Sequence, residues 1–138
     1  MAHLNVASLP KHIDELRLQL TKQSLDILSI NETRLDNTIN DGLIHLNGYD
    51  VLRKDRNRMG GGIAIYFRDN INIKNRNDLV PDSLEALCVE VRKPKSKPIL
   101  IVSCYRPPNS NHEVLKLNEN LIKKLDNEEK EIVILFYQ

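Results

Sequence analysis

Residues 25–33 read Leu-Asp-Ile-Leu-Ser-Ile-Asn-Glu-Thr, and this stretch decides the fold. Its first part, residues 26–30, is short and largely apolar, which predicts a buried strand. Glu32 follows that strand at its carboxyl end. In α/β proteins the carboxyl ends of sheet strands are where ligands and metals are usually placed. Glu32 is therefore the first candidate for a functional residue.

Two other polar residues share this position at the end of an expected strand. Asn5 belongs to a short opening strand at residues 3–6, and Tyr105 follows a nearly all-apolar strand at residues 99–104. An amide, a carboxylate and a phenol at three strand ends indicate one site. Spacing alone leaves a structural alternative open for each residue. Glu32 could be a solvated residue that caps a turn, Asn5 a turn asparagine, and Tyr105 a half-buried strand residue.

Two amphipathic helices are expected. The first begins near Ser8 or Leu9, because Pro10 suits a first helical turn, and its apolar stripe is Ile13, Leu16 and Leu20. The second follows the Pro107-Pro108 pair. Its buried side is expected to carry Val114, Leu117, Leu121, Ile122 and Leu125.

The remaining segments predict a sheet-rich chain. Further strands are expected at residues 49–53, 62–68, 84–92 and 131–136, with a short one near 71–73, while residues 33–48 are a loop with at most a helical turn. On the 84–92 strand, Leu87, Val89 and Val91 are expected on one face. This order predicts an α/β layered sandwich with mixed, largely antiparallel sheets, and residues 1–138 are read as one domain.

The glycine run Gly60-Gly61-Gly62 does not match a phosphate-binding loop. It lacks the Gly-Lys-Ser/Thr ending and leads into a strand rather than a helix, so a hairpin turn is the better reading. The hairpin is basic, and a second basic loop occurs at residues 93–98. Each of the two could contact a phosphate backbone, or it could be a solvated loop tip. The basic residues of the hairpin are Arg53, Lys54, Arg56, Arg58 and Arg68, and those of the second loop are Lys93, Lys95 and Lys97.

Composition excludes several classes of protein. The 138 residues carry a formal net charge of +1 and 28% charged residues, so the chain is neither a polycation nor disordered in character. Cys88 and Cys104 lie in apolar runs, which favours buried thiols over a disulfide. No apolar run reaches the length of a membrane span and no secretory signal is read, so an intracellular location without a membrane partner is expected.

Five segments together resemble the endonuclease/exonuclease/phosphatase superfamily, in particular the apurinic-like endonuclease domain that begins non-LTR retrotransposon polyproteins. They are residues 4–9, 25–33, 48–49, 60–66 and 105–108. The resemblance implies that Glu32 binds the metal, that Asn5 supports the metal site, and that Tyr105 contacts the scissile phosphate.

The resemblance also implies an activity and partners. Members of the family cut DNA by Mg²⁺-dependent phosphodiester hydrolysis, and the transposon members nick target DNA to prime reverse transcription. DNA, the cofactor Mg²⁺, a reverse transcriptase on the same polyprotein and a nuclear location follow as expectations. We expect the DNA contacts to come from Arg53, Lys54, Arg56, Arg58 and Arg106.

The sequence departs from the family pattern after the last strand. The family has Gly-Asp-x-Asn there and Ser-Asp-His later, whereas these residues read Phe136-Tyr137-Gln138 and neither motif occurs. The chain thus resembles the N-terminal part of the family's domain, with little or no nuclease activity expected from it alone and with a final strand left partly uncovered. Two alternatives stay open: an inactive transposon-derived fragment that binds DNA weakly, and a phosphatase of the same superfamily.

Overall fold

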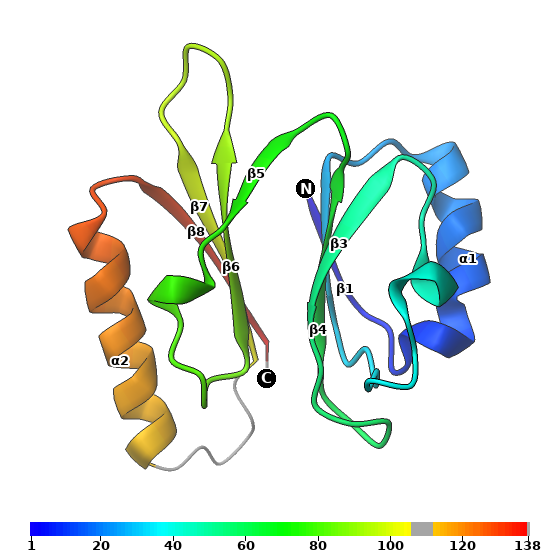
Figure 1. Ribbon diagram of the computed structural model, residues 1–138, viewed down its shortest axis with the longest axis horizontal. Coiled ribbons are helices and arrows are strands. Elements are labelled where there is room, and N and C mark those ends of the chain that lie inside the picture. The colour runs from blue at the N-terminus through cyan, green and yellow to red at the C-terminus, as the bar shows by residue number, and fades with distance from the viewer. Residues whose placement is uncertain (106–111, 138) are drawn as a thin grey trace. The chain divides into compact units, whose positions relative to one another are not determined.

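The computed structural model describes residues 1–105 and 112–137, which form two compact units divided between Asn70 and Ile71. Each unit contains a four-stranded mixed sheet and one long helix (Figure 1). Four of the six strand pairings are antiparallel. The predicted α/β class with mixed, largely antiparallel sheets is therefore confirmed.

The N-terminal unit builds its sheet in the order β1-β2-β4-β3. Its elements are β1 (Ala2–Asn5), α1 (Leu9–Lys22), β2 (Ile27–Asn31), the short 3-10 helix η1 (Asp41–Ile44), β3 (Tyr49–Lys54) and β4 (Ile63–Arg68). β1 and β2 are parallel neighbours joined by α1, as a βαβ connection requires. β3 and β4 form the predicted antiparallel hairpin.

Helix α1 begins where the sequence predicts, but without a side-chain cap. Ser8 is the N-cap with φ 108°, and no side chain bonds to the first turn. The backbone N–H groups of Ser8 and Leu9 instead donate to the carbonyls of Glu32 and Thr33, each at 2.8 Å. The start of α1 is thereby tied to the turn that carries Glu32.

The apolar stripe of α1 packs on the sheet as expected. Leu9, Ile13 and Leu16 are buried in one core cluster with residues of β2 and β4, and Leu20 is partly buried against it. In Figure 1 the helix lies along one face of this sheet. Burial of this stripe fixes how β1 and β2 lie side by side.

The C-terminal unit has the strand order β5-β6-β7-β8. Its elements are β5 (Asn72–Asn75), the 3-10 helix η2 (Asn77–Leu79), β6 (Ala86–Arg92), β7 (Ile99–Tyr105), α2 (His112–Asn127) and β8 (Glu131–Tyr137). The core on the α2 side of the sheet includes Ala86 and Cys88. Leu87, Val89 and Val91 alternate with them and so share the other face, as predicted.

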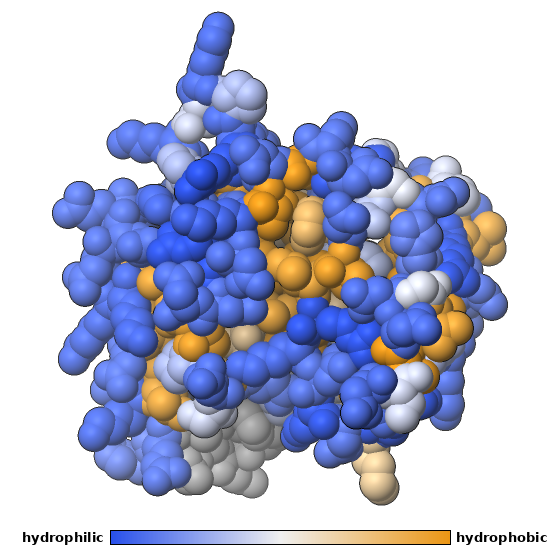
Figure 2. Space-filling model, in the orientation of Figure 1, coloured by the Kyte–Doolittle hydropathy of each residue, from blue (hydrophilic) through white to orange (hydrophobic). Residues whose placement is uncertain are grey.

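The buried side of α2 is narrower than the sequence suggests. Leu121 and Leu125 are buried and Leu117 packs against their cluster, but Ile122 is 42% exposed. The prediction for Ile122 is therefore wrong, because it sits about 100° round the helix from Leu121. The side chain of Val114 lies outside the described residues. Figure 2 shows mostly hydrophilic side chains over this helix.

Strand β8 is only partly uncovered. It pairs in parallel with β7 and is the last strand in its sheet, so its other edge has no partner strand in the described part of the chain. Ile132 and Ile134, however, pack against the α2 cluster. The expectation of an uncovered edge is confirmed, whereas that of an uncovered apolar face is wrong for the face that carries these two residues.

Both cysteines are buried free thiols, as predicted. Burial raises the pKa of Cys88 to about 12, so the thiol stays protonated and unreactive at neutral pH. Among the described residues, no helix is both long and apolar enough to cross a lipid bilayer.

Candidate metal and phosphate site

Glu32 lies in a turn immediately after β2, with a left-handed backbone of φ 57°. Its side chain is 18% exposed, so the carboxylate is largely shielded but still open to solvent. One carboxylate oxygen, Oε2, accepts the backbone N–H of Gly61 at 3.3 Å. The guanidinium groups of Arg34 and Arg56 lie at 3.7 and 3.8 Å from the two oxygens.

The glycine run holds this turn in place. The carbonyls of Gly61 and Gly62 accept the backbone N–H groups of Arg34 and Thr33 at 2.9 and 3.4 Å. A side chain at Gly62, where φ is 93°, would put its Cβ 2.2 Å from Oγ1 of Thr33. The predicted hairpin turn is confirmed, and the structure adds a second role: the glycines let the hairpin backbone approach Glu32.

Asn5 ends the neighbouring strand at the same edge of the sheet. It pairs in register with Asn31, the residue before Glu32, and parallel neighbours lie roughly 4.8 Å apart. Its side chain is exposed, and its Oδ1 accepts the backbone N–H of Ala7 at 3.2 Å. The structure therefore places Asn5 and Glu32 at the carboxyl ends of neighbouring parallel strands, whereas a shared role at one site stays a prediction.

Left-handed backbone conformations gather at this end of the sheet. Non-glycine residues rarely adopt them, and clusters of such strain occur at functional sites. The residues involved at this edge are Ala7, Ser8, Glu32, Arg34, Gly61 and Gly62. The backbone is held in these conformations by the hydrogen bonds between the three turns.

The donors at this edge fit a hard divalent cation. Mg²⁺ commonly takes one or two protein carboxylates and completes its shell with water and phosphate, and Glu32 supplies one carboxylate. The arginine contacts exceed 3.5 Å, so they balance the charge of the carboxylate without making short hydrogen bonds to it. Within residues 1–105 and 112–137, no group of three or more His, Cys, Asp or Glu side chains could form a protein-only metal cage.

Two buried side-chain oxygens on the residues next to Glu32 in the sequence also lack a hydrogen-bond partner among the described residues. Oδ1 of Asn31 and Oγ1 of Thr33, which flank Glu32, make no hydrogen bond within the described part of the chain. Such orphaned oxygens are costly unless water or an ion satisfies them.

Tyr105 is the last residue of β7 in the C-terminal unit. It is half-buried, and its backbone N–H donates to the carbonyl of Glu85 at 2.9 Å. Its place at a strand end is as predicted, whereas its role at the phosphate stays a prediction. Arg106 lies outside the described residues.

The basic hairpin residues do not all point to solvent. Arg53 is only 14% exposed in its side chain and donates to the carbonyls of Ile39 and Asp36 at 2.7 and 2.8 Å. Asp55 and then Asp41 raise its pKa further. Arg53 thus anchors the loop before β3, while Arg56 and Arg58 are exposed and Lys54 is half-buried.

Sequence reasoning missed Arg34 and the backbone of Gly61 as partners of Glu32. Arg34 follows Glu32 by two residues, and a cation that close to a candidate carboxylate could have been noted. The Gly61 contact spans 29 residues and depends on how the hairpin folds back. No local pattern reveals it.

Comparison with solved structures defines the class of fold. The chain is similar to the endonuclease domain of TRAS1, a telomere-specific non-LTR retrotransposon (TM-score 0.66, 17% identity, 96% of this chain and 55% of that one). It is also similar to a 3′-5′ exonuclease from Neisseria meningitidis (0.69, 16%, 98% and 55%). It is similar as well to an AP endonuclease from Archaeoglobus fulgidus, with a TM-score of 0.64 and 18% identity over 98% of this chain and 55% of that one.

The chain therefore shares its fold with these endonuclease and exonuclease structures, and the resemblance seen in the sequence is confirmed at the level of fold. Identities this low show the fold alone. The chain spans 55% of the length of each of these three structures, consistent with their N-terminal part. A scan of protein-family models and a sequence search of curated proteins both give no match.

Proposed function

We propose that this chain supplies one part of a Mg²⁺-dependent phosphodiesterase site that acts on DNA, of the kind that nicks target DNA for a retrotransposon. The observation that carries the proposal is the carboxylate of Glu32. It stands at a strand end in a fold shared with nucleases, beside Asn5 and within a strained turn. The nuclease neighbours support DNA as the substrate class.

In this proposal Glu32 would hold Mg²⁺, which would supply positive charge next to the phosphate that water attacks. Glu32 binds the cation, and the Gly61 N–H fixes the orientation of its carboxylate. Asn5 donates or accepts hydrogen bonds beside the metal. Tyr105 donates its hydroxyl to the phosphate.

DNA is held by the basic hairpin in this proposal. Arg56 and Arg58 are exposed and suited to phosphate contacts, and Lys54 and Arg106 are proposed to contribute as well. Arg53 is the weakest of the predicted contacts, because its guanidinium already bonds to two carbonyls and two aspartates. A reverse transcriptase on the same polyprotein and action in the nucleus belong to the same proposal.

The proposal is tested by the effect of Mg²⁺ on binding of a short DNA duplex, followed by fluorescence anisotropy. If Glu32 holds a cation that bridges to phosphate, Mg²⁺ tightens binding by the wild-type chain and not by Glu32→Gln. Glu15→Gln is the matched control, since Glu15 is 79% exposed on α1 in the same unit. Equal Mg²⁺ responses in wild type and Glu32→Gln would contradict the proposal.

A second candidate function is a non-catalytic DNA binder. It is favoured by the two arginines that already face Glu32. This alternative predicts DNA binding that weakens with salt and does not respond to Glu32→Gln. The same anisotropy experiment therefore separates the two.

A further inference from the structure

A pocket of about 500 Å³ lies in the N-terminal unit, at the end of the sheet opposite Glu32. Tyr49 and Arg68 line it and form the first pair of the β3–β4 ladder, whereas Lys54 and Ile63 form the last pair, next to the glycine run. Five residue steps along a strand correspond to roughly 17 Å. The pocket is therefore separate from the candidate metal site.

The walls of the pocket carry positive charge without an acidic residue. Its lining consists of Arg17, Leu20, Thr21, Gly42, His45, Leu46, Asn47, Tyr49 and Arg68. The acidic partners of its arginines lie outside the lining and are solvated: Asp14 is 92% exposed and Asp26 is 73% exposed. Exposed ion pairs hold little energy, so an anion in the pocket competes with these two carboxylates at little cost.

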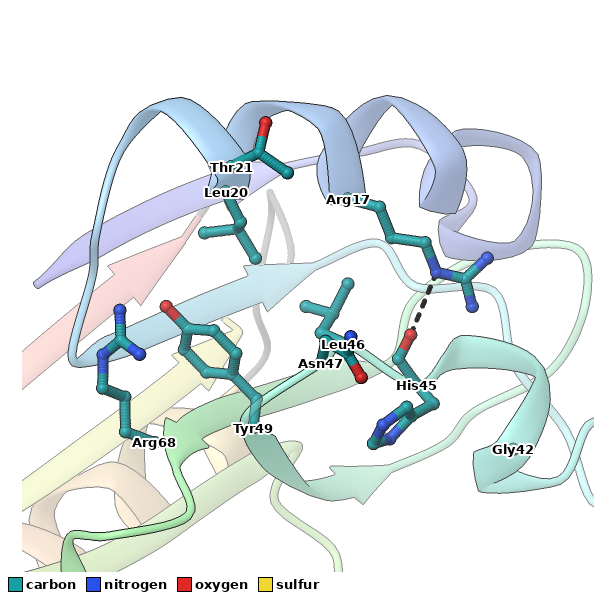
Figure 3. Close-up of a pocket in the computed structure, with 9 residues that line it drawn as sticks. All are labelled: Arg17, Leu20, Thr21, Gly42, His45, Leu46, Asn47, Tyr49 and Arg68. Atoms are coloured by element: carbon teal, nitrogen blue, oxygen red, sulfur yellow. Dashed lines mark hydrogen bonds between the residues drawn. The ribbon is translucent and has the colours of Figure 1, made fainter.

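An apolar surface lies between the two arginines. Figure 3 shows the Tyr49 ring and the side chains of Leu20 and Leu46 in the middle of the lining, with Arg17 and Arg68 on either side. The guanidinium carbon of Arg68 lies 5.2 Å from the centroid of the Tyr49 ring. The Tyr49 hydroxyl donates to the carbonyl of Leu25, so the ring offers its apolar body to the pocket.

Both arginines are held in place by the fold. Nε of Arg17 donates to the carbonyl of His45 at 3.0 Å, which ties α1 to the loop before β3. Arg68 bonds to Oγ of Ser24 and lies on Tyr49. Cations fixed in this way lose little side-chain freedom when they bind an anion.

We propose that this pocket binds a small planar aromatic anion, with a nucleoside monophosphate as the ligand class. The volume suits such a ligand. The base packs against Leu20, Leu46 and the Tyr49 ring, and the phosphate is held by Arg68 at one end of this apolar surface. Arg17, at the other end, adds positive charge without touching the phosphate. Positively charged side chains around an apolar surface attract an anion, and the apolar surface favours an anion that carries a ring.

The test uses adenosine 5′-monophosphate as the probe, with EDTA present so that a metal at Glu32 plays no part. Binding to the full 138-residue chain is measured by calorimetry and mapped by amide chemical shifts. Adenosine and ribose 5-phosphate each lack half of the recognised chemistry. We expect each to bind at least about tenfold more weakly than the monophosphate, since one charge-assisted bond is worth that factor.

The main variant is Arg68→Gln, expected to weaken binding about tenfold. Arg17→Gln is expected to weaken it less, and Lys11→Gln, an exposed change on α1, is the control. If a variant fails to fold, the amide chemical-shift changes of the wild-type chain test the proposal instead. The proposal then requires that the probe shifts the amide signals of Leu20, Thr21, Leu46 and Asn47. A 5′-phosphorylated oligonucleotide is also tested as a competitor of the probe. If it displaces adenosine 5′-monophosphate, the pocket recognises the same nucleotide chemistry at the 5′ end of a DNA strand.

Three results would overturn the proposal. These are no shifts in the lining at millimolar probe, equal binding of adenosine or ribose 5-phosphate, or unchanged binding in a folded Arg68→Gln chain. None of them bears on Mg²⁺ or on Glu32. Failure here therefore leaves the proposed nuclease site standing.

Discussion

The turn that carries Glu32 depends on a close approach between two backbones, and Gly62 is the residue that permits it. Gly62→Ala adds a Cβ that would lie 2.2 Å from Oγ1 of Thr33, at a φ of 93°. We expect this variant to lose about 2 kcal/mol of unfolding free energy in a urea titration.

Gly60→Ala is the matched control for that experiment. A Cβ at Gly60 would lie 3.7 Å from the Arg56 guanidinium, an ordinary contact, and the φ of Gly60 is not in the left-handed region. Equal stability of the Gly60 and Gly62 variants would show that the hairpin does not press on the Glu32 turn.

Arg56 is expected to compete with a divalent cation for Glu32. Its Nη2 lies 3.8 Å from Oε1 of Glu32, and its side chain is 43% exposed. Arg56→Gln removes that competing charge, so we predict about threefold tighter Mn²⁺ binding, in line with the energy of an exposed ion pair. Calorimetry measures the affinity, and Arg58→Gln in the same hairpin should leave it unchanged. Weaker Mn²⁺ binding by Arg56→Gln would show that Arg56 does not compete with the cation for Glu32.

At the scale of elements, a buried ion network joins η2, β6 and the turn before β8. Glu90 is fully buried on β6 and accepts from Lys130 at 2.6 Å, Arg92 at 2.5 Å and Arg76 at 2.9 Å. These hydrogen bonds lower the pKa of Glu90 from 4.5 to about 2, and the bond from Lys130 has the largest effect. Arg76 also pairs with Glu128 at 2.5 Å.

This network makes stability depend on pH in a defined window. Because the folded pKa of Glu90 is lowered, its stabilising effect is complete above pH 4.5 and is lost as the pH falls towards 2. Glu90→Gln should cost about 3 kcal/mol at neutral pH and should flatten the acid limb of the stability curve. Glu119→Gln, an exposed change on α2, should not. An unchanged acid limb in Glu90→Gln would contradict this assignment.

The elements show what sequence patterns can and cannot predict. Strand and helix positions follow from local periodicity, so β2, α1 and the β3–β4 hairpin lie where expected. Asn5 and Glu32 are adjacent because parallel strands joined by a helix align their ends. The buried positions of Glu90 and Arg53, and the contact of Gly61 with Glu32, depend on residues 14 to 40 positions away. Local patterns do not contain that information.

At the scale of the whole molecule, the fold is shared with nucleases that are nearly twice as long. General acid–base groups commonly contribute 10²–10⁴-fold to such reactions, and the 138 residues lack the two motifs that supply them in the resembled family. We predict that this chain alone nicks supercoiled plasmid slowly or not at all with Mg²⁺. Rapid nicking that is lost in Glu32→Gln would contradict the prediction of low activity and support the enzyme assignment.

The central claim is that Glu32 binds a divalent cation, and Mn²⁺ binding followed by electron paramagnetic resonance tests it most directly. Mn²⁺ is a spectroscopic substitute for Mg²⁺ with the same preference for oxygen ligands. We expect the wild type and Glu15→Gln to bind Mn²⁺ at one site and Glu32→Gln to lose that site. Equal Mn²⁺ binding by wild type and Glu32→Gln would contradict it.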